Sequence, residues 1–529
     1  MTSAAELLRQ GRRDEVWTKY CGFLDLTIEE FMQLQERLLM GQLHLLSKSG
    51  LGQELLGDRL PSSVEEFRKI VPLTAYRDYL PFLLQGKEEI LPAKPQVWAR
   101  TSGRSGEYEC KWAPYSSRMV KKAGEFAIAA FLLGSCSGRG DVRLSPTDTC
   151  LYTLAPPPYF TGAVVAQGLN EELQPTFIPS LEEGDNMEFE ERIREGFARA
   201  LTTGIDLFYG LSSVLVKIAE QFQEGGSEFE YSARMMNPRL LYRVLKGLVR
   251  SKTQGRGLLP KDLWKVKAIV AGGMDTAFYR DAIEAYWGVA PLEGYGGTEL
   301  VGVALQAWNR KGMTFLPDCN FLEFIPEEEF FHSLDNPDHQ PGTLTLDQVG
   351  SGVYELVITN FHGGVFVRYR TGDLVEIVST QDREIGVALP QMVFHARADG
   401  VIDVGGFTRL TEKAMWRALE EAEVPYVEWT MRKEYLDGRP SLHLYVELVD
   451  GLKPEDIKSQ VSNKLREQDP GFGDLETMLG LEPLAVTKVA AGAFDRYQET
   501  MRAAGADLAH IKPPRVNPSD EIMQRLLSQ

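Results

Sequence analysis

The sequence lacks the long hydrophobic runs and paired cysteines that mark several large classes of protein. No stretch approaches the ~18 consecutive apolar residues of a membrane-spanning helix, and the first residues lack the apolar core of a secretory signal. The five cysteines stand at wide spacings without a C-x-x-C pair, which disfavours a disulfide framework and a zinc site. We therefore expect a soluble, cytoplasmic protein with reduced thiols.

The sequence also lacks a surplus of basic residues. Its 57 lysines and arginines are outnumbered by 75 aspartates and glutamates, which gives a net charge of −18. Nonspecific binding to nucleic acid or to an anionic membrane needs a basic face, so we expect neither as a partner. If the ligand is an anion, nearby cations must overcome this global field.

Several catalytic signatures are missing as well. The seven histidines show no H-E-x-x-H spacing, which disfavours a histidine metal site. The segment GLSSV at 210–214 has no G-x-S-x-G pattern, so a nucleophilic serine has no support. The chemistry must be sought elsewhere in the chain.

The length and periodicity predict a two-part α/β protein. A chain of 529 residues is expected to form two or three folded units, because a typical domain has ~150 residues. Apolar residues at helical spacing predict helices over the first ~57 residues. Strand-like runs then alternate with helical stretches up to about residue 395, which is typical of an α/β domain whose loops carry function. The strand-like runs are 149–154, 205–209, 266–271 and 354–359, and the helical stretches are 119–131, 189–201, 213–222 and 274–287.

The pattern changes after residue 400. Val427, Trp429 and Met431 alternate with polar residues, an Asp-Gly turn follows at 437–438, and apolar residues alternate again over 442–448. This pattern predicts a hairpin with one buried face. A helix from Pro454 and a strand over 484–489 complete a small α+β unit.

The first candidate binding segment is the loop TSGRSG at 101–106, followed by Lys111. Its glycines let backbone N–H groups face a phosphate, its hydroxyls add donors, and a predicted helix lies downstream. The Walker A spacing is missing. A plain turn is the alternative interpretation of this segment taken alone.

The second segment is EGYGGTE at 293–299. An aromatic ring between glycines, Tyr295, can stack on a flat ligand, while Thr298 and Glu299 offer a hydroxyl and a hard oxygen ligand for Mg²⁺. The alternative is a glycine-rich turn with an exposed acid.

The third segment is VRYRTGDL at 367–374. It places Asp373 after a glycine, at the end of a strand-like run, where a carboxylate can accept hydrogen bonds from two vicinal ribose hydroxyls. The alternative is an Arg–Asp surface pair of little energetic consequence. A fourth segment, FHARADG at 394–400, stands near the boundary of the two predicted units.

The order of these four segments resembles the adenylate-forming enzymes, which have a loop S/T-S/T-G-T-S/T-G followed by Lys, then Y-G-x-T-E and Y-R-x-G-D. Within that superfamily the sequence most resembles the Gretchen Hagen auxin-responsive family of acyl acid amido synthetases. Further likenesses are FYGLSS at 208–213, LP at 316–317, FLEFIP at 321–326, YELVIT at 354–359 and KPPR at 512–515. The resemblance spans most of the chain.

The resemblance implies an α/β fold with a large adenylate-forming N-terminal domain of mixed sheets and helices, residues 1–396, which binds ATP and the acid. A smaller, mobile α+β domain follows at 397–529. The implied contacts are Ser102, Gly103, Ser105 and Gly106 on the β and γ phosphates, Tyr295 on adenine with Gly296 in the same cofactor-binding set, Thr298 on a phosphate, Glu299 on Mg²⁺, Asp373 on the ribose, and Arg397 on ribose or phosphate near the hinge.

Three cations are the candidates for catalysis. Lys512 falls where a C-terminal lysine of the family approaches the reacting oxygens. Arg104 replaces the usual Thr of the phosphate loop, and Lys111 stands farther from Gly106 than in the wider superfamily, so either can act on the phosphates.

The resemblance implies an ATP- and Mg²⁺-dependent ligase that adenylates a carboxylic acid. Two anions ~4 Å apart repel by about 4 kcal/mol at an effective dielectric near 20, so cations must cancel that repulsion. The resemblance favours transfer of the acyl group to an amine, that of an amino acid, to form an amide. An acyl-coenzyme A ligase with the same first step and a nucleotide-binding regulatory protein without catalysis are the alternatives.

Overall fold

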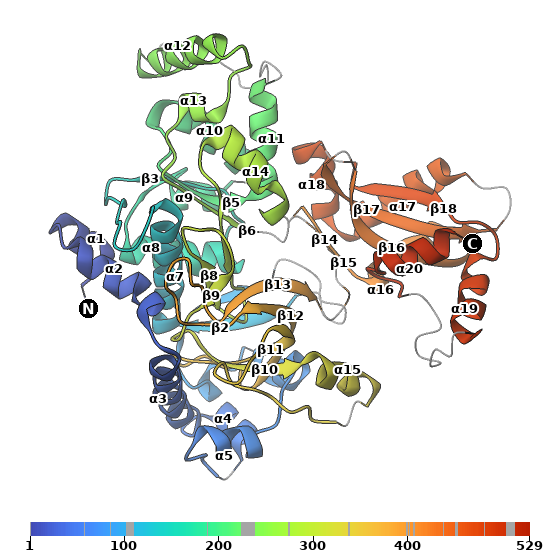
Figure 1. Ribbon diagram of the computed structural model, residues 1–529, viewed down its shortest axis with the longest axis horizontal. Coiled ribbons are helices and arrows are strands. Elements are labelled where there is room, and N and C mark those ends of the chain that lie inside the picture. The colour runs from blue at the N-terminus through green and yellow to red at the C-terminus, as the bar shows by residue number, and fades with distance from the viewer. Residues whose placement is uncertain are drawn as a thin grey trace. The chain divides into compact units, whose positions relative to one another are not determined.

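The protein is described from a computed structural model (Figure 1). The structure describes residues 2–57, 59–84, 86–101, 110–187, 189–223, 238–272, 276–336, 339–397, 400, 402–405, 408–436, 438–449, 453–480, 482–503 and 514–528. The chain divides into two compact units. The first is Met1–Ser102, Lys111–Gly272 and Thr276–Ala396, and the body of the second is Arg397–Gln529.

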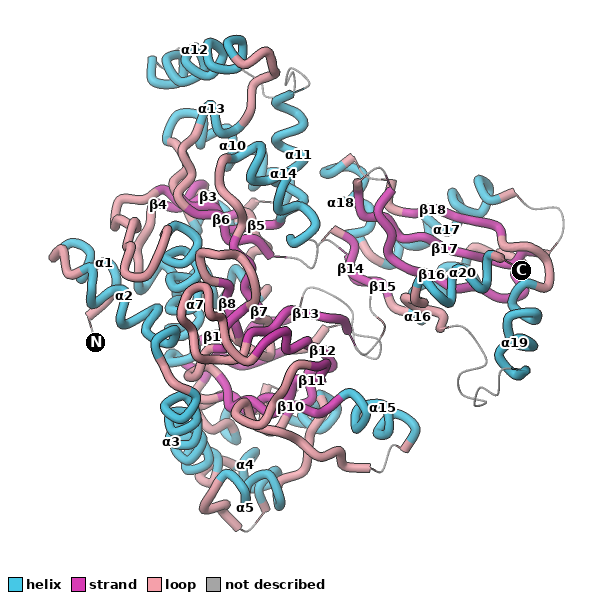
Figure 2. The backbone as a smooth tube through the Cα atoms, in the orientation of Figure 1, coloured by secondary structure: helices cyan, strands magenta, loops and turns pink. Residues whose placement is uncertain are grey.

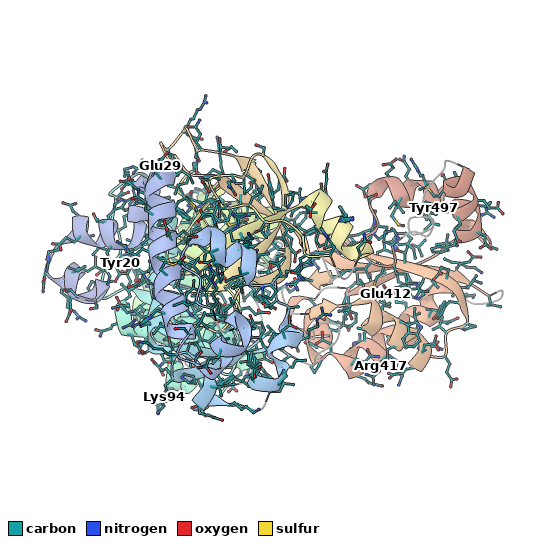
Figure 3. The ribbon with its side chains drawn as sticks, turned by 90° about the horizontal axis from the view of Figure 1, so that it is seen from below. Tyr20, Glu29, Lys94, Glu412, Arg417 and Tyr497 are labelled. Carbon is teal, nitrogen blue, oxygen red and sulfur yellow. The ribbon has the colours of Figure 1, made fainter. Side chains whose placement is uncertain are left out.

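The first unit begins with the predicted helices. They are α1 (Ala4–Arg9), α2 (Arg13–Cys21), α3 (Ile28–Leu46) and α4 (Gly50–Leu56), and α5 (Val64–Ile70) follows beyond the predicted range. A capping box with Thr27 and Glu30 starts α3, because the two side chains satisfy N–H groups that have no partner within the helix. Leu39 and Leu43 of α3 then pack against Phe321 of the sheet. The hydroxyl of Tyr20 (Figure 3) anchors α2 by donating to Glu172 at 2.8 Å.

Among the described residues, eleven strands form one mixed sheet in the order β10-β11-β12-β13-β9-β8-β7-β6-β5-β3-β4. Figure 2 shows its strands running through the first unit with helices outside them. The strands are β3 (Thr149–Tyr152), β4 (Thr176–Ile178), β5 (Leu207–Leu211), β6 (Ala268–Gly272), β7 (Leu292–Tyr295), β8 (Ala304–Gln306), β9 (Met313–Phe315), β10 (Asn320–Pro326), β11 (Gly352–Asn360), β12 (Tyr369–Ser379) and β13 (Gln391–Arg397). The half from β4 to β7 is parallel, and β7 to β9 and β10 to β12 pair antiparallel.

The predicted strands and helices of this unit are confirmed to within a few residues. The helices are α6 (Leu80–Leu83), α7 (Ser117–Ser135), α8 (Gln167–Glu172), α9 (Leu181–Asp185), α10 (Phe189–Thr203), α11 (Ser212–Gln223), α12 (Pro238–Thr253), α13 (Pro260–Leu263), α14 (Thr276–Trp287) and α15 (Glu327–Asp335). Trp264 and Trp287 stack with ring centroids 5.6 Å apart. Phe197 and Phe208 lie against them and extend the aromatic core between the helices and the parallel strands.

The antiparallel half of the sheet is strongly curved. The order places β13, β9 and β8 between β12 and β7, which in a flat sheet separates those two strands by about 19 Å, because neighbouring strands lie ~4.8 Å apart. Yet the Tyr295 hydroxyl at the end of β7 lies 2.6 Å from Oδ2 of Asp373 on β12. The strands between them therefore curl so that β7 and β12 face each other.

The second unit is a small α+β structure. Its elements are β14 (Ile402–Val404), β15 (Thr408–Leu410), α16 (Glu412–Glu421), β16 (Tyr426–Leu436), β17 (Arg439–Leu448), α17 (Pro454–Gln468), α18 (Pro470–Leu479), β18 (Leu484–Lys488), α19 (Ala493–Ala503) and α20 (Asp520–Leu527). The predicted hairpin is confirmed as β16 paired with β17, and β18 joins β17 in parallel.

Two details of the predicted hairpin are wrong. Val427 was expected on the buried face with Trp429, but it is 56% exposed. A register shift between Tyr426 and Glu428 explains this, because a bulge changes the face to which the following side chains point. The second face of the hairpin is also covered: Tyr445 packs with Tyr497 of α19, labelled in Figure 3, and with residues of α20.

All five cysteines are unpaired, and all but Cys110 are buried. Within the part of the chain that the structure describes, no helix has the length and apolar character needed to cross a bilayer.

Candidate active site

The base of the glycine-rich loop is a two-stranded hairpin. Strand β1 (Pro95–Arg100) pairs with β2 (Trp112–Ser116). The Thr101 N–H donates to the Lys111 carbonyl at 3.0 Å, and the Lys111 N–H donates to Thr101 Oγ1 at 3.1 Å. The two ends of the loop are thereby held together. The predicted residues of the loop itself, Ser102, Gly103, Arg104, Ser105 and Gly106, lie outside the described residues. Lys512 also lies outside them.

A tight turn after β7 presents the second motif. The N–H groups of Leu300 and Val301 both donate to the Gly297 carbonyl, at 3.0 and 2.9 Å. A Cβ at Gly296 would overlap the Val301 carbonyl oxygen, so the chain can reverse this sharply only with glycine there. The turn carries Thr298 and Glu299 directly after it leaves the strand.

Tyr295 and Asp373 form a buried pair. The tyrosine hydroxyl donates to Asp373 Oδ2 at 2.6 Å, and the two residues are 9% and 6% exposed. The Tyr295 ring also lies against Phe394, with centroids 5.9 Å apart. The bond and the ring contact together fix the orientation of the tyrosine. The alternative interpretation of Asp373 as a surface Arg–Asp pair is wrong, because its carboxylate is buried and accepts from a tyrosine.

The arginine of the same motif has a structural role. Arg370 pairs with Glu355 of β11 at 2.6 Å, and the Glu355 side chain is 2% exposed. Burial raises the pKa of Glu355, and the hydrogen bonds from Arg370 oppose that shift. Arg370 therefore holds β12 against its neighbour, which leaves Asp373 as the ligand-type residue of this segment.

Lys111, Glu299 and Tyr369 form a second polar cluster. Lys111 Nζ lies 3.1 Å from Glu299 Oε1, and the two side chains are 12% and 15% exposed. Lys111 also donates to the Tyr369 hydroxyl at 3.0 Å, which in turn donates to Glu299 Oε1 at 3.3 Å. The ammonium group lies 5.5 Å from the Tyr76 ring centroid. The carboxylate is thus neutralised by a lysine that an aromatic surface also stabilises.

The two clusters repeat one spacing. Tyr295 meets Asp373, and Glu299 meets Tyr369, so the partners are four residues apart on both segments. One segment is β7 with its turn and the other is β12, and the two run in opposite chain directions. One side of the site is therefore aromatic with a buried carboxylate, and the other is charged.

The charged side adjoins the hairpin base. Thr298 Oγ1 lies 3.5 Å from the Arg100 carbonyl oxygen, and the Tyr115 hydroxyl donates to the Thr298 carbonyl. Burial raises the pKa of Tyr115 well above its usual value, so it stays a neutral donor. These contacts tie the turn of the second motif to the two strands that flank the glycine-rich loop.

Sequence reasoning missed two residues of this region. Tyr369 was quoted within a motif, but nothing in the pattern indicated that it bridges Lys111 and Glu299. Arg100 directly precedes the loop. Its guanidinium donates to the Tyr159 hydroxyl at 3.1 Å and covers that ring at 4.7 Å, while its buried Nε has no hydrogen-bond partner among the described residues. Its position beside a phosphate-type loop was the signal that could have revealed it.

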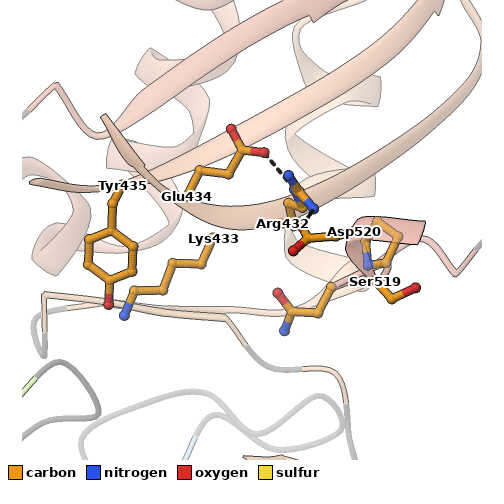
Figure 4. Close-up of a pocket in the computed structure, with 8 residues that line it drawn as sticks. Arg432, Lys433, Glu434, Tyr435, Ser519 and Asp520 are labelled. Atoms are coloured by element: carbon orange, nitrogen blue, oxygen red, sulfur yellow. Dashed lines mark hydrogen bonds and ion pairs between the residues drawn. The ribbon is translucent and has the colours of Figure 1, made fainter. Parts of the chain in front are cut away.

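The remaining predicted residue, Arg397, ends β13 and begins the second unit. That unit has a pocket of about 610 Å³ (Figure 4), and none of the predicted site residues that the structure describes line it. Its arginine, Arg432, pairs with Glu434 at 2.5 Å and with Asp520 at 2.6 Å, so the charges of the pocket largely compensate one another.

The described residues hold no group of three or more acidic, histidine or cysteine side chains arranged for a metal. A metal that arrives with a nucleotide needs less, because Mg²⁺ is commonly bound by one or two carboxylates with phosphates and water. Glu299, part-buried beside the loop base, fits that requirement.

Comparison with solved structures defines the class of fold. An acyl acid amido synthetase, AtGH3.15 in complex with 2,4-DB, matches with a TM-score of 0.52 and 16% identity over 98% of this chain and 95% of that one. A 2-hydroxyisobutyryl-CoA ligase with 2-HIB-AMP and CoA matches with a TM-score of 0.51 and 13% identity, over 92% of this chain and 87% of that one. At such identities the likeness concerns the fold alone, which is that of the adenylate-forming enzymes.

Family models then identify the chain. The N-terminal, central and C-terminal domain models of the GH3 family match residues 21–140, 313–397 and 410–521, together more than half of the sequence. The chain belongs to the GH3 family, and the resemblance inferred from its motifs is confirmed.

A curated relative, "Probable indole-3-acetic acid-amido synthetase GH3.11" of Oryza sativa subsp. japonica, is 26% identical over 314 residues, which cover 52% of this chain and 49% of the relative. The chain thus spans about half the length of the curated relatives it matches.

Proposed function

We propose that the protein is an ATP-dependent ligase that adenylates a carboxylic acid and transfers the acyl group to the amine of an amino acid, forming an amide. The observation that carries the proposal is the paired arrangement of Tyr295 with Asp373 and of Glu299 with Lys111 and Tyr369 beside the base of the glycine-rich loop. The family membership and the names of the relatives support the same reaction.

The aromatic side would bind the nucleoside. Tyr295 would stack on adenine beside Gly296, because its ring is held in one orientation by Asp373 and Phe394. Asp373 would accept hydrogen bonds from the ribose hydroxyls, since a carboxylate presents two acceptor oxygens. Arg397 would support the ribose or a phosphate.

The charged side would bind the phosphates. Ser102, Gly103, Ser105 and Gly106 would surround the β and γ phosphates from the loop, and Thr298 would add its hydroxyl. Glu299 would hold Mg²⁺, which when bound supplies charge neutralisation at the phosphates. Lys111, whose Nζ lies 3.1 Å from Glu299 Oε1, would contact the phosphate oxygens together with Arg104 and Lys512.

In the proposed reaction an oxygen of the substrate carboxylate attacks the α phosphorus, and pyrophosphate leaves with its bonding electron pair. The amine nitrogen then attacks the acyl carbon, AMP leaves, and the nitrogen loses a proton. The protein contributes alignment, which is worth effective molarities of roughly 10⁵ M and above, and fixed positive charge where negative charge gathers.

The two units would divide the work. We propose that residues 1–396 bind ATP and the acid, and that the smaller domain, 397–529, moves between the two half-reactions. Gly400 and Gly405 have φ values of 65° and 63°, in a region that glycine adopts without strain. We place the enzyme in the cytoplasm.

A pyrophosphate exchange assay tests the proposal. The purified chain with ATP, Mg²⁺ and labelled pyrophosphate is offered a panel of carboxylic acids, and we expect label to enter ATP only when a suitable acid is present. If ATP raises the melting temperature but no acid in a broad panel supports exchange, the ligase proposal fails and the regulatory alternative is favoured.

A second assay identifies the acceptor. Amino acids and coenzyme A are offered together with ATP and an acid that supports exchange, and the products are identified by mass spectrometry. We expect the amide. Exclusive formation of the coenzyme A thioester would overturn the second half of the proposal and leave the first intact.

A further inference from the structure

Helix α12 presents its apolar side to solvent. A surface helix ordinarily turns its apolar stripe toward the core. In α12, which lies at the outer edge of its unit in Figure 1, the stripe points outward. The exposed side chains are Leu241 (47%), Tyr242 (67%), Leu245 (53%), Leu248 (39%) and Val249 (65%).

The inward side explains this orientation. Gly247 faces α13, and a Cβ there would lie 3.0 Å from Leu258 Cδ1, so the glycine favours this close approach. Ser251, one turn on, is 3% exposed. Arg243 Nη1 donates to the carbonyls of Ala200 and Leu201 in α10, at 3.1 and 2.7 Å. Small residues and an arginine therefore attach the helix and leave the leucines outside.

The helix is also strongly basic in an acidic protein. It carries basic residues and no aspartate or glutamate, although the whole chain has a net charge of −18. The basic residues are Arg239, Arg243, Lys246, Arg250 and Lys252. Lys246 and Arg250 are exposed and one turn apart, and at 100° per residue they lie along one border of the apolar stripe.

We propose that α12 docks the protein onto an anionic lipid surface. An exposed apolar stripe bordered by lysine and arginine, without acids, is the pattern of helices that lie in the membrane interface. Leu241, Leu245 and Val249 enter the boundary between headgroups and acyl chains, while Lys246 and Arg250 contact anionic headgroups. The positive charge of the helix complements the negative charge of the lipid surface, which favours an anionic membrane as the partner.

A second copy of the chain fits less well. Symmetric pairing through the stripe would bring the two basic borders together, because such an interface uses the same patch on both partners, and like charges repel. The net charge, from which we expected no membrane partner, does not decide the matter either. At physiological ionic strength charges act over about 8 Å, so the lipid surface responds to α12 and not to distant acids.

Vesicle sedimentation with the full chain tests the proposal. We expect the protein to sediment with phosphatidylcholine vesicles containing about 30% phosphatidylserine, to stay in solution with phosphatidylcholine alone, and to be released at about 0.5 M salt, where screening shortens the reach of the charges. A wild-type chain that stays in solution with the anionic vesicles at low salt overturns the proposal.

Two double variants separate the components. Leu245→Glu with Leu248→Glu removes the stripe, and we expect at least tenfold weaker vesicle binding; the control is Leu84→Glu, whose leucine is 60% exposed outside α12. Lys246→Glu with Arg250→Glu reverses the border, and we expect at least about twentyfold weaker binding, since each basic residue near an anionic surface contributes about fivefold. Its control is Lys48→Glu with Arg194→Glu, both exposed elsewhere in the same unit.

Two outcomes contradict the proposal in this second experiment. Either the variants bind like the wild type, or the wild type forms dimers in sedimentation velocity that the leucine variant abolishes, which would mean that a second copy covers the stripe. Far-UV circular dichroism confirms that the variants fold, which we expect because all the altered side chains are exposed. The lipid and salt dependence of the wild type tests the proposal without any variant.

Discussion

The hydroxyl of Tyr295 donates a 2.6 Å hydrogen bond to Asp373, 78 residues away in the sequence. Both side chains are buried, and the bond spans a sheet in which three strands separate their own. It joins the proposed adenine-stacking ring to the proposed ribose ligand. A change at either residue is therefore expected to affect the nucleoside end of the site as a whole.

Tyr295→Phe is expected to lower the free energy of unfolding by about 1–3 kcal/mol, because it removes the hydroxyl that donates to a buried carboxylate oxygen. Asp373→Asn is expected to raise the KM for ATP at least tenfold by weakening the ribose contact. Urea unfolding of both single variants and the double variant gives their coupling. Strictly additive effects would show that the hydrogen bond contributes nothing.

Glu299→Gln is expected to raise the Mg²⁺ concentration needed for half-maximal exchange and to lower kcat by about 10²-fold, the scale of removing one preorganised electrostatic contact. Lys111→Ala is expected to lower kcat similarly. Lys48→Ala, at an exposed lysine, is the control. If the Mg²⁺ dependence of Glu299→Gln equals that of the wild type, Glu299 does not bind the metal.

Gly296→Ala is expected to abolish activity and destabilise the first unit, because the new methyl group overlaps the Val301 carbonyl and the turn that carries Glu299 must open. Gly297→Ala is the matched control. Among the described residues, a Cβ there meets only Leu300 Cδ1, at 3.8 Å, so we expect near-normal stability. The melting temperatures and exchange rates of the two variants check the difference, and equal effects would contradict it.

Arg100→Ala is expected to raise the KM for ATP about tenfold, the effect of losing one charge-assisted contact, since among the described residues its buried Nε, at the base of the phosphate-type loop, has no hydrogen-bond partner. Arg100→Lys keeps the charge but not the planar donor geometry, and we expect it to restore part of the affinity. A KM for ATP that stays at the wild-type value in Arg100→Ala would exclude a phosphate contact.

Glu172 is expected to make stability sensitive to acid. Burial raises its pKa, but hydrogen bonds from Tyr20 and Lys19 outweigh burial, and the net pKa lies below its usual value of 4.5. A lowered pKa in the folded state means that the carboxylate stabilises the fold above pH 4.5 and that this contribution is lost as the pH falls through the lowered pKa.

Comparing the pH dependence of the melting temperature for the wild type and Glu172→Gln tests this expectation. The variant is expected to be less stable at neutral pH and to lose less stability on acidification. If the two curves run parallel below pH 5, where carboxylates titrate, Glu172 does not contribute.

The local features of the molecule could be predicted from its sequence. Alternating apolar residues identified the hairpin of β16 and β17, and helical spacing identified α10 and α17, because periodicity reflects which face of a single element is buried. The motifs around Tyr295, Glu299 and Asp373 were found in the same way, since glycine and hydroxyl patterns are also local. The family followed from the order of these motifs.

Contacts between distant segments were decided only by the tertiary structure. The ion pair of Lys111 with Glu299 and the bridging hydroxyl of Tyr369 depend on how the starts of β2 and β12 and the turn after β7 come together, and no spacing within one segment encodes the curl of a sheet. The exposure of Val427 depends on a bulge in strand pairing.

The outward stripe of α12 shows the same division. The spacing of its apolar and basic residues makes the helix amphipathic, but Gly247, Arg243 and their neighbours in α10 and α13 determine which side faces solvent. Secondary structure follows from local preference, whereas the pairing of faces requires the whole fold to minimise exposed apolar area and unpaired polar groups together.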